Sequence, residues 1–286
     1  MKTSLQIPVK LLSAALSGLS LVIQPRSTVA IAQFVRFKAD LAGQLTIQAC
    51  DTTSFVSFHC PNQEWPATDF LFPASALANL VGRLEPHEHI TFIQEQPEIV
   101  ILRCKVEERY VEERIAVISA EHWRKQPDLG EPLVVFDGSF KTGMSEVMKR
   151  ILASHRAYSF DGLLLDVPKP NTFYVVGNVT HPLFYGRSFN LDLLQPAILP
   201  KHRFLGWNGF CNDGAWNFSV QPQQGPAKWV KLKSSNWTFI GTTLPRNYPS
   251  WRQVDLDHDL RFQNKVAFGQ HSPLPSNSLF RGLWSS

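Results

Sequence analysis

The chemistry-bearing residues of this chain are considered first for metal binding. Residues 255–259 hold three aspartates and a histidine, and carboxylate oxygens are ligands that hard metal ions prefer. The run lacks the spacing and the glycine turn of a calcium-binding loop, so we expect a solvated loop. His87 and His89 stand two residues apart in a proline-marked segment without further ligands nearby. We therefore expect no metal and no cofactor.

Nucleophilic catalysis has no better support. Asp51, His181 and Ser154 can be written as a triad, but residues of almost any chain can be combined in this way. The P-loop, G-x-S-x-G and H-E-x-x-H motifs are absent from the sequence. No C-x-x-C pair occurs either, and we expect buried free thiols rather than two disulfides for the four cysteines, Cys50, Cys60, Cys104 and Cys211. The sequence predicts a protein that is not an enzyme.

Length and charge limit the remaining possibilities. The chain has 286 residues, of which 44% are hydrophobic, which is enough for two domains with separate cores. Residues 1–130 carry 12 Lys and Arg against 14 Asp and Glu, whereas residues 131–286 carry 16 against 10. A modest positive excess fits weak contact with a polyanion but does not by itself identify a nucleic-acid-binding protein.

The N-terminal segment, residues 1–32, is open to two interpretations. Two lysines, an apolar run and the sequence Ala30-Ile-Ala32 resemble a signal peptide that is cleaved before Gln33. Alternatively, the segment is a folded amphipathic helix, because Leu12, Leu16 and Leu19 lie on one stripe at helical spacing. An internal repeat favours the folded helix.

The repeat appears when the sequence is aligned with itself so that position 12 falls on position 140. The stripe of the first segment then falls on apolar residues of a second one, Phe140, Met144, Val147 and Ile151. Later strand-like segments also coincide, and a second helical stretch at residues 74–81 matches a shorter one near residues 201–207. Proline and glycine in residues 126–134 mark a boundary. We expect one domain at residues 1–130, a second at 131–256 and a C-terminal tail at 257–286.

The apolar pattern of each half therefore predicts a strand, a helix, paired strands, a second helix and further alternating strands. This order indicates an α+β fold in which antiparallel sheets carry two helices on one face per domain.

Several segments now resemble one known family. The opening LQIPVKLLSAALSGLSLVIQPRST, followed by GQLTIQACDTTSFVSF, is similar to the first domain of bacterial beta sliding clamps. FLFPASALANLVGRL looks like the start of that domain's second helix, and ISAEHWRKQPDL resembles its exit peptide. WTFIGTTLPRNYPSWRQVDL resembles the end of a clamp's middle domain. The resemblance covers about residues 5–256.

The resemblance implies two tandem DNA-clamp domains that contribute to a closed ring of six domains, with helices lining the hole and sheets outside. Two domains per chain favour a homo-oligomeric trimer. The implied partners are double-stranded DNA, held without sequence readout, a DNA polymerase or other clamp-binding proteins, and a clamp loader. We expect a cytoplasmic, nucleoid-associated processivity or tethering factor with no membrane contact.

Basic residues on the helix faces and in the turns that follow them are the expected DNA-facing set. These are Lys10, Arg26, Arg83, Lys141, Lys149, Arg150, Arg156, Lys201 and Arg203. Lys141, Ser145 and Lys149 stand four residues apart, which predicts one shared polar face. Each residue taken alone is also compatible with an ordinary solvated position.

Partner binding has two candidate segments. The linker offers Trp123, Leu129, Val134 and Phe136, which are equally compatible with an interdomain core. The tail offers Leu279 and Phe280 after a polar, proline-containing spacer, and packing on the second domain is the alternative.

Two other functions remain open at this point. One is an exported, β-rich binding protein with a cleaved signal peptide at residues 1–32. The other is a clamp-derived protein-interaction module that no longer encircles DNA.

Overall fold

The computed structural model describes residues 3–61, 64–106, 109–136, 138–153, 162–169, 172–179, 181–188, 196–221 and 229–245. Residues Met1–Asn247 form one compact unit, and Tyr248–Ser286 form a second that lies outside the described residues. The account below concerns the first unit.

The first half of this unit begins with a strand and a helix. Its elements are β1 (Thr3–Pro8), α1 (Val9–Leu19), η1 (Ala30–Gln33), β2 (Phe34–Ala39), β3 (Leu45–Cys50), β4 (Ser54–His59), β5 (Thr68–Pro73), α2 (Ala74–Val81), β6 (His89–Gln96), β7 (Ile99–Val106), β8 (Arg109–Ala116), β9 (Ile118–Ser119) and η2 (Ala120–His122).

The second half repeats that order. Its elements are β10 (Val134–Phe136), α3 (Gly138–Ala153), β11 (Gly162–Lys169), β12 (Thr172–Val179), β13 (His181–Ser188), β14 (Ala197–Pro200), η3 (Arg203–Gly206), α4 (Asn208–Cys211), β15 (Trp216–Val220), β16 (Trp229–Lys233) and β17 (Trp237–Thr242).

Strand pairing is the same in both halves. The four-stranded sheet β1-β6-β7-β8 has its counterpart in β10-β15-β16-β17, and β4-β3-β2-β5 has its counterpart in β13-β12-β11-β14. Antiparallel pairing of β17 with β4 joins one set from each half, and β9, which pairs with β5, completes a nine-stranded sheet. The predicted α+β fold with antiparallel sheets is thus confirmed, whereas the domain boundary at residue 130 remains a proposal.

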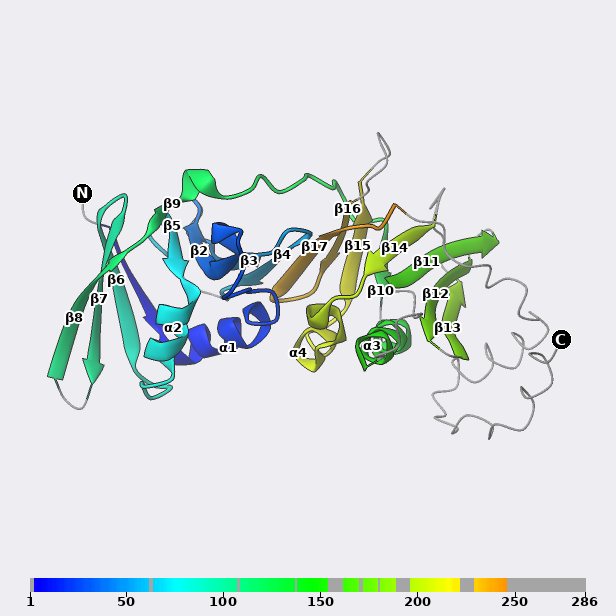
Figure 1. Ribbon diagram of the computed structural model, residues 1–286, viewed down its shortest axis with the longest axis horizontal. Helices are drawn as coiled ribbons and strands as arrows, with labels where there is room; N and C mark the ends of the chain where they lie inside the picture. Colours follow the sequence, from blue (N-terminus) through cyan, green and yellow to red (C-terminus); the bar gives the residue numbers. More distant parts are fainter. Residues whose placement is uncertain are drawn as a thin grey trace. The chain divides into compact units, whose positions relative to one another are not determined.

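The helices lie together on one side of the sheets (Figure 1). In α1 two residues of the predicted apolar stripe, Leu12 and Leu19, are buried, and the third, Leu16, is partly buried against the same core. In α3 the corresponding buried residues include Val147 and Ile151. Since α1 contributes directly to the core, the structure favours the folded helix over a signal peptide.

Close packing holds α3 on its sheet. A side chain at Gly177 of β12 would place its Cβ 2.4 Å from Val147 Cγ1, so only glycine allows the helix to approach this closely. The aromatic residues of the second half also serve the core, because Trp216 and Trp237 are buried. The four cysteines are free and buried, as expected from the sequence.

The two halves meet around the β17–β4 pair. Trp237 of β17 lies opposite Phe58 of β4, with ring centroids 4.8 Å apart. A Cβ on Gly18 of α1 would lie 2.4 Å from Trp237 Cη2 and 2.8 Å from Trp207 Cζ3. The contact between α1 and the second half is therefore matched in shape and leaves no room for a larger residue.

Candidate nucleic-acid interface

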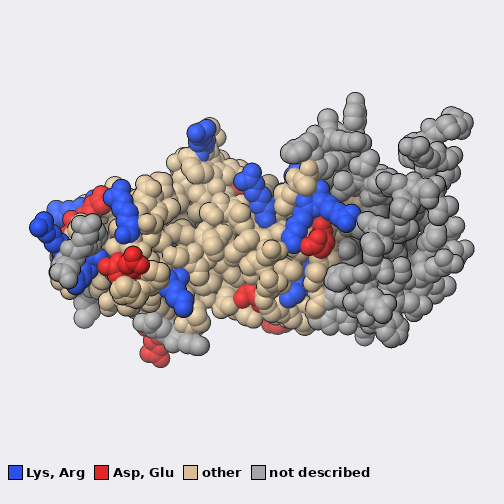
Figure 2. All heavy atoms as spheres, turned by 90° about the horizontal axis from the view of Figure 1, so that it is seen from below, with Lys and Arg blue, Asp and Glu red and all other residues tan. Residues whose placement is uncertain are grey.

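The side of the sheets that carries the helices is the candidate surface. Figure 2 looks onto that side and shows Lys and Arg scattered over it, with acidic groups among them and no single dense basic patch among the described residues. The surface therefore offers dispersed positive charge rather than a binding pocket.

In the first half, Lys10, Arg26 and Arg83 have exposed side chains. The backbone N–H of Lys10 donates to the carbonyl of Pro86 at 3.1 Å, so the start of α1 lies against the loop that follows Arg83. Acidic residues in that loop, including Glu85, offset part of the positive charge. The turn that carries Arg26 is closed by a hydrogen bond from the N–H of Ser27 to the carbonyl of Gln24 at 2.9 Å.

In α3, two of the predicted cations are engaged within the chain. Lys141 Nζ donates to the carbonyl of Gly214 at 2.6 Å, and Lys149 Nζ lies 2.7 Å from Glu146 Oε1. Ser145, which we expected between them on a polar face, is fully buried. That expectation was wrong, because the helix turns Ser145 towards the core along with its apolar neighbours.

The remaining second-half residues differ in exposure. Arg150 and Arg203 are exposed, while Lys201 is half-buried and interacts with other groups. A Cβ on Gly206 would lie 3.4 Å from Lys149 Cγ, so α3 and η3 bring their basic residues into one neighbourhood. Arg156 lies outside the described residues.

Such a surface can attract phosphates but cannot read sequence. Exposed lysine and arginine side chains neutralise the backbone of a duplex, whereas base readout needs an element that enters a groove. Of the predicted DNA-facing residues, five have exposed side chains, and their contact with DNA stays a prediction: Lys10, Arg26, Arg83, Arg150 and Arg203.

The candidate partner residues of the linker are mostly covered. Trp123, Leu129 and Phe136 are buried, and Trp123 and Leu129 pack in one cluster with Phe55 and Ile240. This favours the interdomain-core interpretation for these residues. Val134 is half-buried, and Leu279 and Phe280 lie outside the described residues.

Sequence reasoning missed exposed apolar side chains in two places, the linker and β8. In the linker these are Leu133 (46%) and Val135 (51%), and on β8 they are Tyr110 (77%) and Val111 (44%). Alternating burial along a strand could have suggested Val135, but exposure on β8 depends on that strand having no outer neighbour among the described residues.

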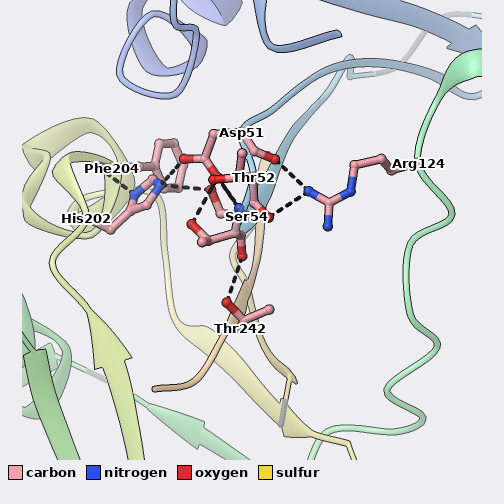
Figure 3. A network of polar contacts seen from close by, with 8 residues as sticks. Asp51, Thr52, Ser54, Arg124, His202, Phe204 and Thr242 are labelled. Atoms are coloured by element: carbon pink, nitrogen blue, oxygen red, sulfur yellow. Dashed lines mark hydrogen bonds and ion pairs between the residues drawn. The ribbon is translucent and has the colours of Figure 1, made fainter. Parts of the chain in front are cut away.

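A polar network links the two halves beside the β17–β4 pair (Figure 3). Asp51 Oδ1 accepts hydrogen bonds from the N–H groups of Thr53 (2.8 Å) and Ser54 (2.7 Å) and from Ser54 Oγ (2.9 Å). Ser54 Oγ also lies 2.9 Å from His202 Nε2. Arg124 Nη1 donates to the carbonyls of Asp51 (2.8 Å) and Thr52 (2.9 Å), which fastens the linker to the same turn.

The Asp51–Ser54–His202 group is structural rather than nucleophilic. The N–H of Phe204 donates to His202 Nδ1 at 3.2 Å, so the ring proton of neutral His202 is on Nε2 and is donated towards Ser54. Nε2 therefore has no free lone pair with which to remove a proton from Ser54. Ser54 is also only 1% exposed, so a substrate has no access to its hydroxyl.

The contacts of the Asp51 carboxyl group stabilise its ionised form. Burial alone raises the pKa of the Asp51 carboxyl, but contact with His202 and hydrogen bonds from Thr53 and Ser54 outweigh burial and lower the pKa to about 2. His202 Nε2 lies 3.7 Å from Asp51 Oδ2. Asp51 is therefore a carboxylate at neutral pH, and it holds both halves at this turn.

Comparison with known proteins identifies the fold through solved structures. No family model and no curated protein matches the chain. None of the helices in the described ranges is long and apolar enough to span a bilayer.

Solved structures do match. The DNA sliding clamp (DNA polymerase III subunit beta) of Pseudomonas aeruginosa, bound to griselimycin, has a TM-score of 0.71 at 14% identity, over 89% of this chain and 68% of the clamp. The clamp of Bacillus subtilis has a TM-score of 0.69 at 12% identity, over the same shares of the two chains. The beta subunit of Streptococcus pyogenes has a TM-score of 0.66 at 15% identity, over 89% and 67%. Identity at this level shows the fold alone, and the chain has the fold of the bacterial DNA sliding clamps.

Proposed function

We propose that this chain is a subunit of a non-catalytic ring that encircles double-stranded DNA and tethers a DNA polymerase or other proteins to it. The observation that carries the proposal is the placement of every described α-helix on one side of the sheets, with exposed basic residues in both halves. A ring retains DNA by topology, so dispersed, weak phosphate contacts are sufficient and permit sliding.

The internal repeat supports three subunits in the proposed ring. Each half builds the same pair of four-stranded sheets and carries its helices in the same order. A six-part ring would then contain three chains, and the mass of three chains of 32.4 kDa is 97.2 kDa. A clamp loader and clamp-binding proteins complete the proposed set of partners, in a cytoplasmic, nucleoid-associated location.

Native mass spectrometry of the untagged protein from its own host tests this proposal. A mass near 97.2 kDa, three times the 32.4 kDa of one chain, with the N-terminal residues retained supports the three-subunit ring. A monomer that begins at Gln33 would contradict it, because α1 would then be absent from the mature protein. A stable monomer with α1 intact would favour a clamp-derived interaction module instead.

A further inference from the structure

The helix-bearing side has an uncharged stretch where the two halves of the chain meet. Residues 11–25, which include most of α1, and residues 204–212, which include α4, contain no Lys, Arg, His, Asp or Glu. These two segments touch, because a Cβ on Gly18 of α1 would lie 2.8 Å from Trp207 Cζ3, and Figure 1 shows α1 and α4 next to each other. A phosphate that passes this stretch meets no basic group from either segment.

Trp207, which directly precedes α4, is held on several sides. Its ring centroid lies 5.3 Å from that of Trp237 of β17 and 5.7 Å from that of Phe204. Cβ atoms on Gly18 and Gly209 would lie 2.8 Å and 2.1 Å from atoms of the Trp207 ring, so these glycines leave the space that the ring fills. The ring is therefore fixed between the sheet, α1 and α4, and solvent reaches it from the helix-bearing side.

The indole N–H of Trp207 is a hydrogen-bond donor that is open to solvent. Trp207 is half-buried, and within the described part of the chain its Nε1 donates to no acceptor. Other tryptophans differ in this respect. The Nε1 atoms of Trp65 and Trp123 are fully buried, and Trp216 Nε1 donates to the carbonyl of Phe210 at 3.1 Å. Trp207 therefore presents a rigidly held donor at the surface.

Asn208, the first residue of α4, provides a second neutral donor. Its side chain is exposed, and its amide group makes no hydrogen bond to the residues that the structure describes. Its backbone carbonyl is engaged in the helix, since it accepts from the N–H of Asn212 at 2.8 Å. An indole N–H and a side-chain amide both donate hydrogen bonds without carrying charge. The uncharged stretch thus has two adjacent donors suited to an anionic acceptor.

We propose that Trp207 Nε1–H and the side-chain amide of Asn208 donate hydrogen bonds to phosphate oxygens of the encircled duplex. This inference rests on the proposed function and adds an uncharged contact to those of the basic residues. Neutral side-chain donors bind phosphates in many protein–DNA complexes, and such contacts carry no sequence information. Because the ring of Trp207 is already fixed, little side-chain entropy is lost when it binds.

Salt dependence separates this contact from the contacts of Lys and Arg. A cation that neutralises a phosphate releases a counterion from the duplex, so removing that cation reduces the slope of log K against log salt concentration. A neutral donor releases no counterion. Removing it therefore lowers the association constant by the same factor at every salt concentration, and we expect a factor of about three to ten for one hydrogen bond.

Trp207→Phe removes the indole N–H and keeps an aromatic ring in the full-length chain. Binding of a short duplex, measured by fluorescence anisotropy at several salt concentrations, should weaken about three- to tenfold with an unchanged salt slope. Trp229→Phe is the matched control, because Trp229 is also half-buried but packs against Phe55 in the cluster beneath the linker. This control should bind the duplex as the wild type does.

Asn208→Ala tests the second donor without altering the core, since the side chain of Asn208 is exposed. It should weaken binding with the same unchanged salt slope, and it gives a result even where Trp207→Phe fails to fold by circular dichroism. Wild-type affinity of both folded variants would overturn the inference. A salt slope reduced to that of the double variant Arg150→Ala, Arg203→Ala would overturn it as well, because the lost contact would then be ionic.

Indole N–H resonances of protein labelled with ¹⁵N-tryptophan locate the contact directly. The chain has eight tryptophans, and each Trp→Phe variant identifies one resonance by its loss. On addition of the duplex, the Trp207 resonance should shift and the Trp229 resonance should not. An unshifted Trp207 resonance in wild-type protein that binds the duplex would overturn this contact and leave the proposed ring intact. Wild-type protein that binds no duplex at any salt concentration would instead overturn the proposed function itself.

Discussion

Asp51→Asn tests whether the carboxylate at the junction stabilises the fold. The pKa of Asp51 falls from an ordinary value of 3.8 to about 2 in the folded chain. At about 1.4 kcal/mol per pKa unit, this difference corresponds to about 2 kcal/mol of the free energy of unfolding. The side chain is only 11% exposed, so solvent screens the contribution little.

The pH dependence has a defined sign. Because the folded pKa is below the unfolded pKa, the stabilisation is complete well above pH 3.8 and is lost as the pH falls through about 2. Urea unfolding of the wild type and of Asp51→Asn should differ by about 2 kcal/mol at pH 7 and by about half of that at pH 3. A difference that stays constant over this range, or one below about 0.5 kcal/mol at pH 7, would refute the reasoning.

Three further predictions concern packing, charge and thiols. Gly18→Ala places a methyl group against Trp237 and Trp207. It should lower the free energy of unfolding, measured by urea titration, by about 1–3 kcal/mol. Gly138→Ala is the control: its added Cβ meets nothing within 4 Å, so it should leave the free energy of unfolding unreduced. The double variant Arg150→Ala, Arg203→Ala removes two exposed cations, so it should weaken DNA binding and reduce the salt dependence of binding, both measured by fluorescence anisotropy. Lys149→Ala should have a smaller effect, because the ammonium group of Lys149 is paired with Glu146. Equal effects of the two variants would contradict this account. Burial raises the pKa of the Cys50 and Cys60 thiols to about 12. At pH 8 these thiols should therefore not react with a thiol reagent in the native protein, and both should react after unfolding. Rapid labelling of the native protein would contradict their burial.

Local patterns were sufficient to predict the fold. Leu12 and Leu19 recur at helical spacing and face the core, and the alternation around Trp216 and Trp229 coincides with strands. The recurrence of the same pattern later in the chain then predicted that the second half repeats the first. These signals depend on residues that are close together in the sequence, so one chain was enough to read them.

The candidate site was less predictable because its geometry depends on distant residues. Lys141 finds its acceptor at Gly214, and Ser54 meets His202 across 148 positions of the sequence. Ser145 occupies a helical position that looked polar but packs inward. Tyr110 is exposed because no described strand lies on the outer side of β8, and residues close to it in the sequence do not indicate this.

Retention on circular DNA tests the central claim most directly. The protein is mixed with a nicked circular plasmid in an ATP-supplemented extract of its own host, which supplies the proposed clamp loader. The complex is washed in salt that removes non-topological binding, and bound protein is measured before and after the plasmid is linearised. Encirclement predicts that protein co-elutes with the circular plasmid and is released when one cut opens it. Equal retention on circular and linear DNA, or no retention on either, would contradict the account.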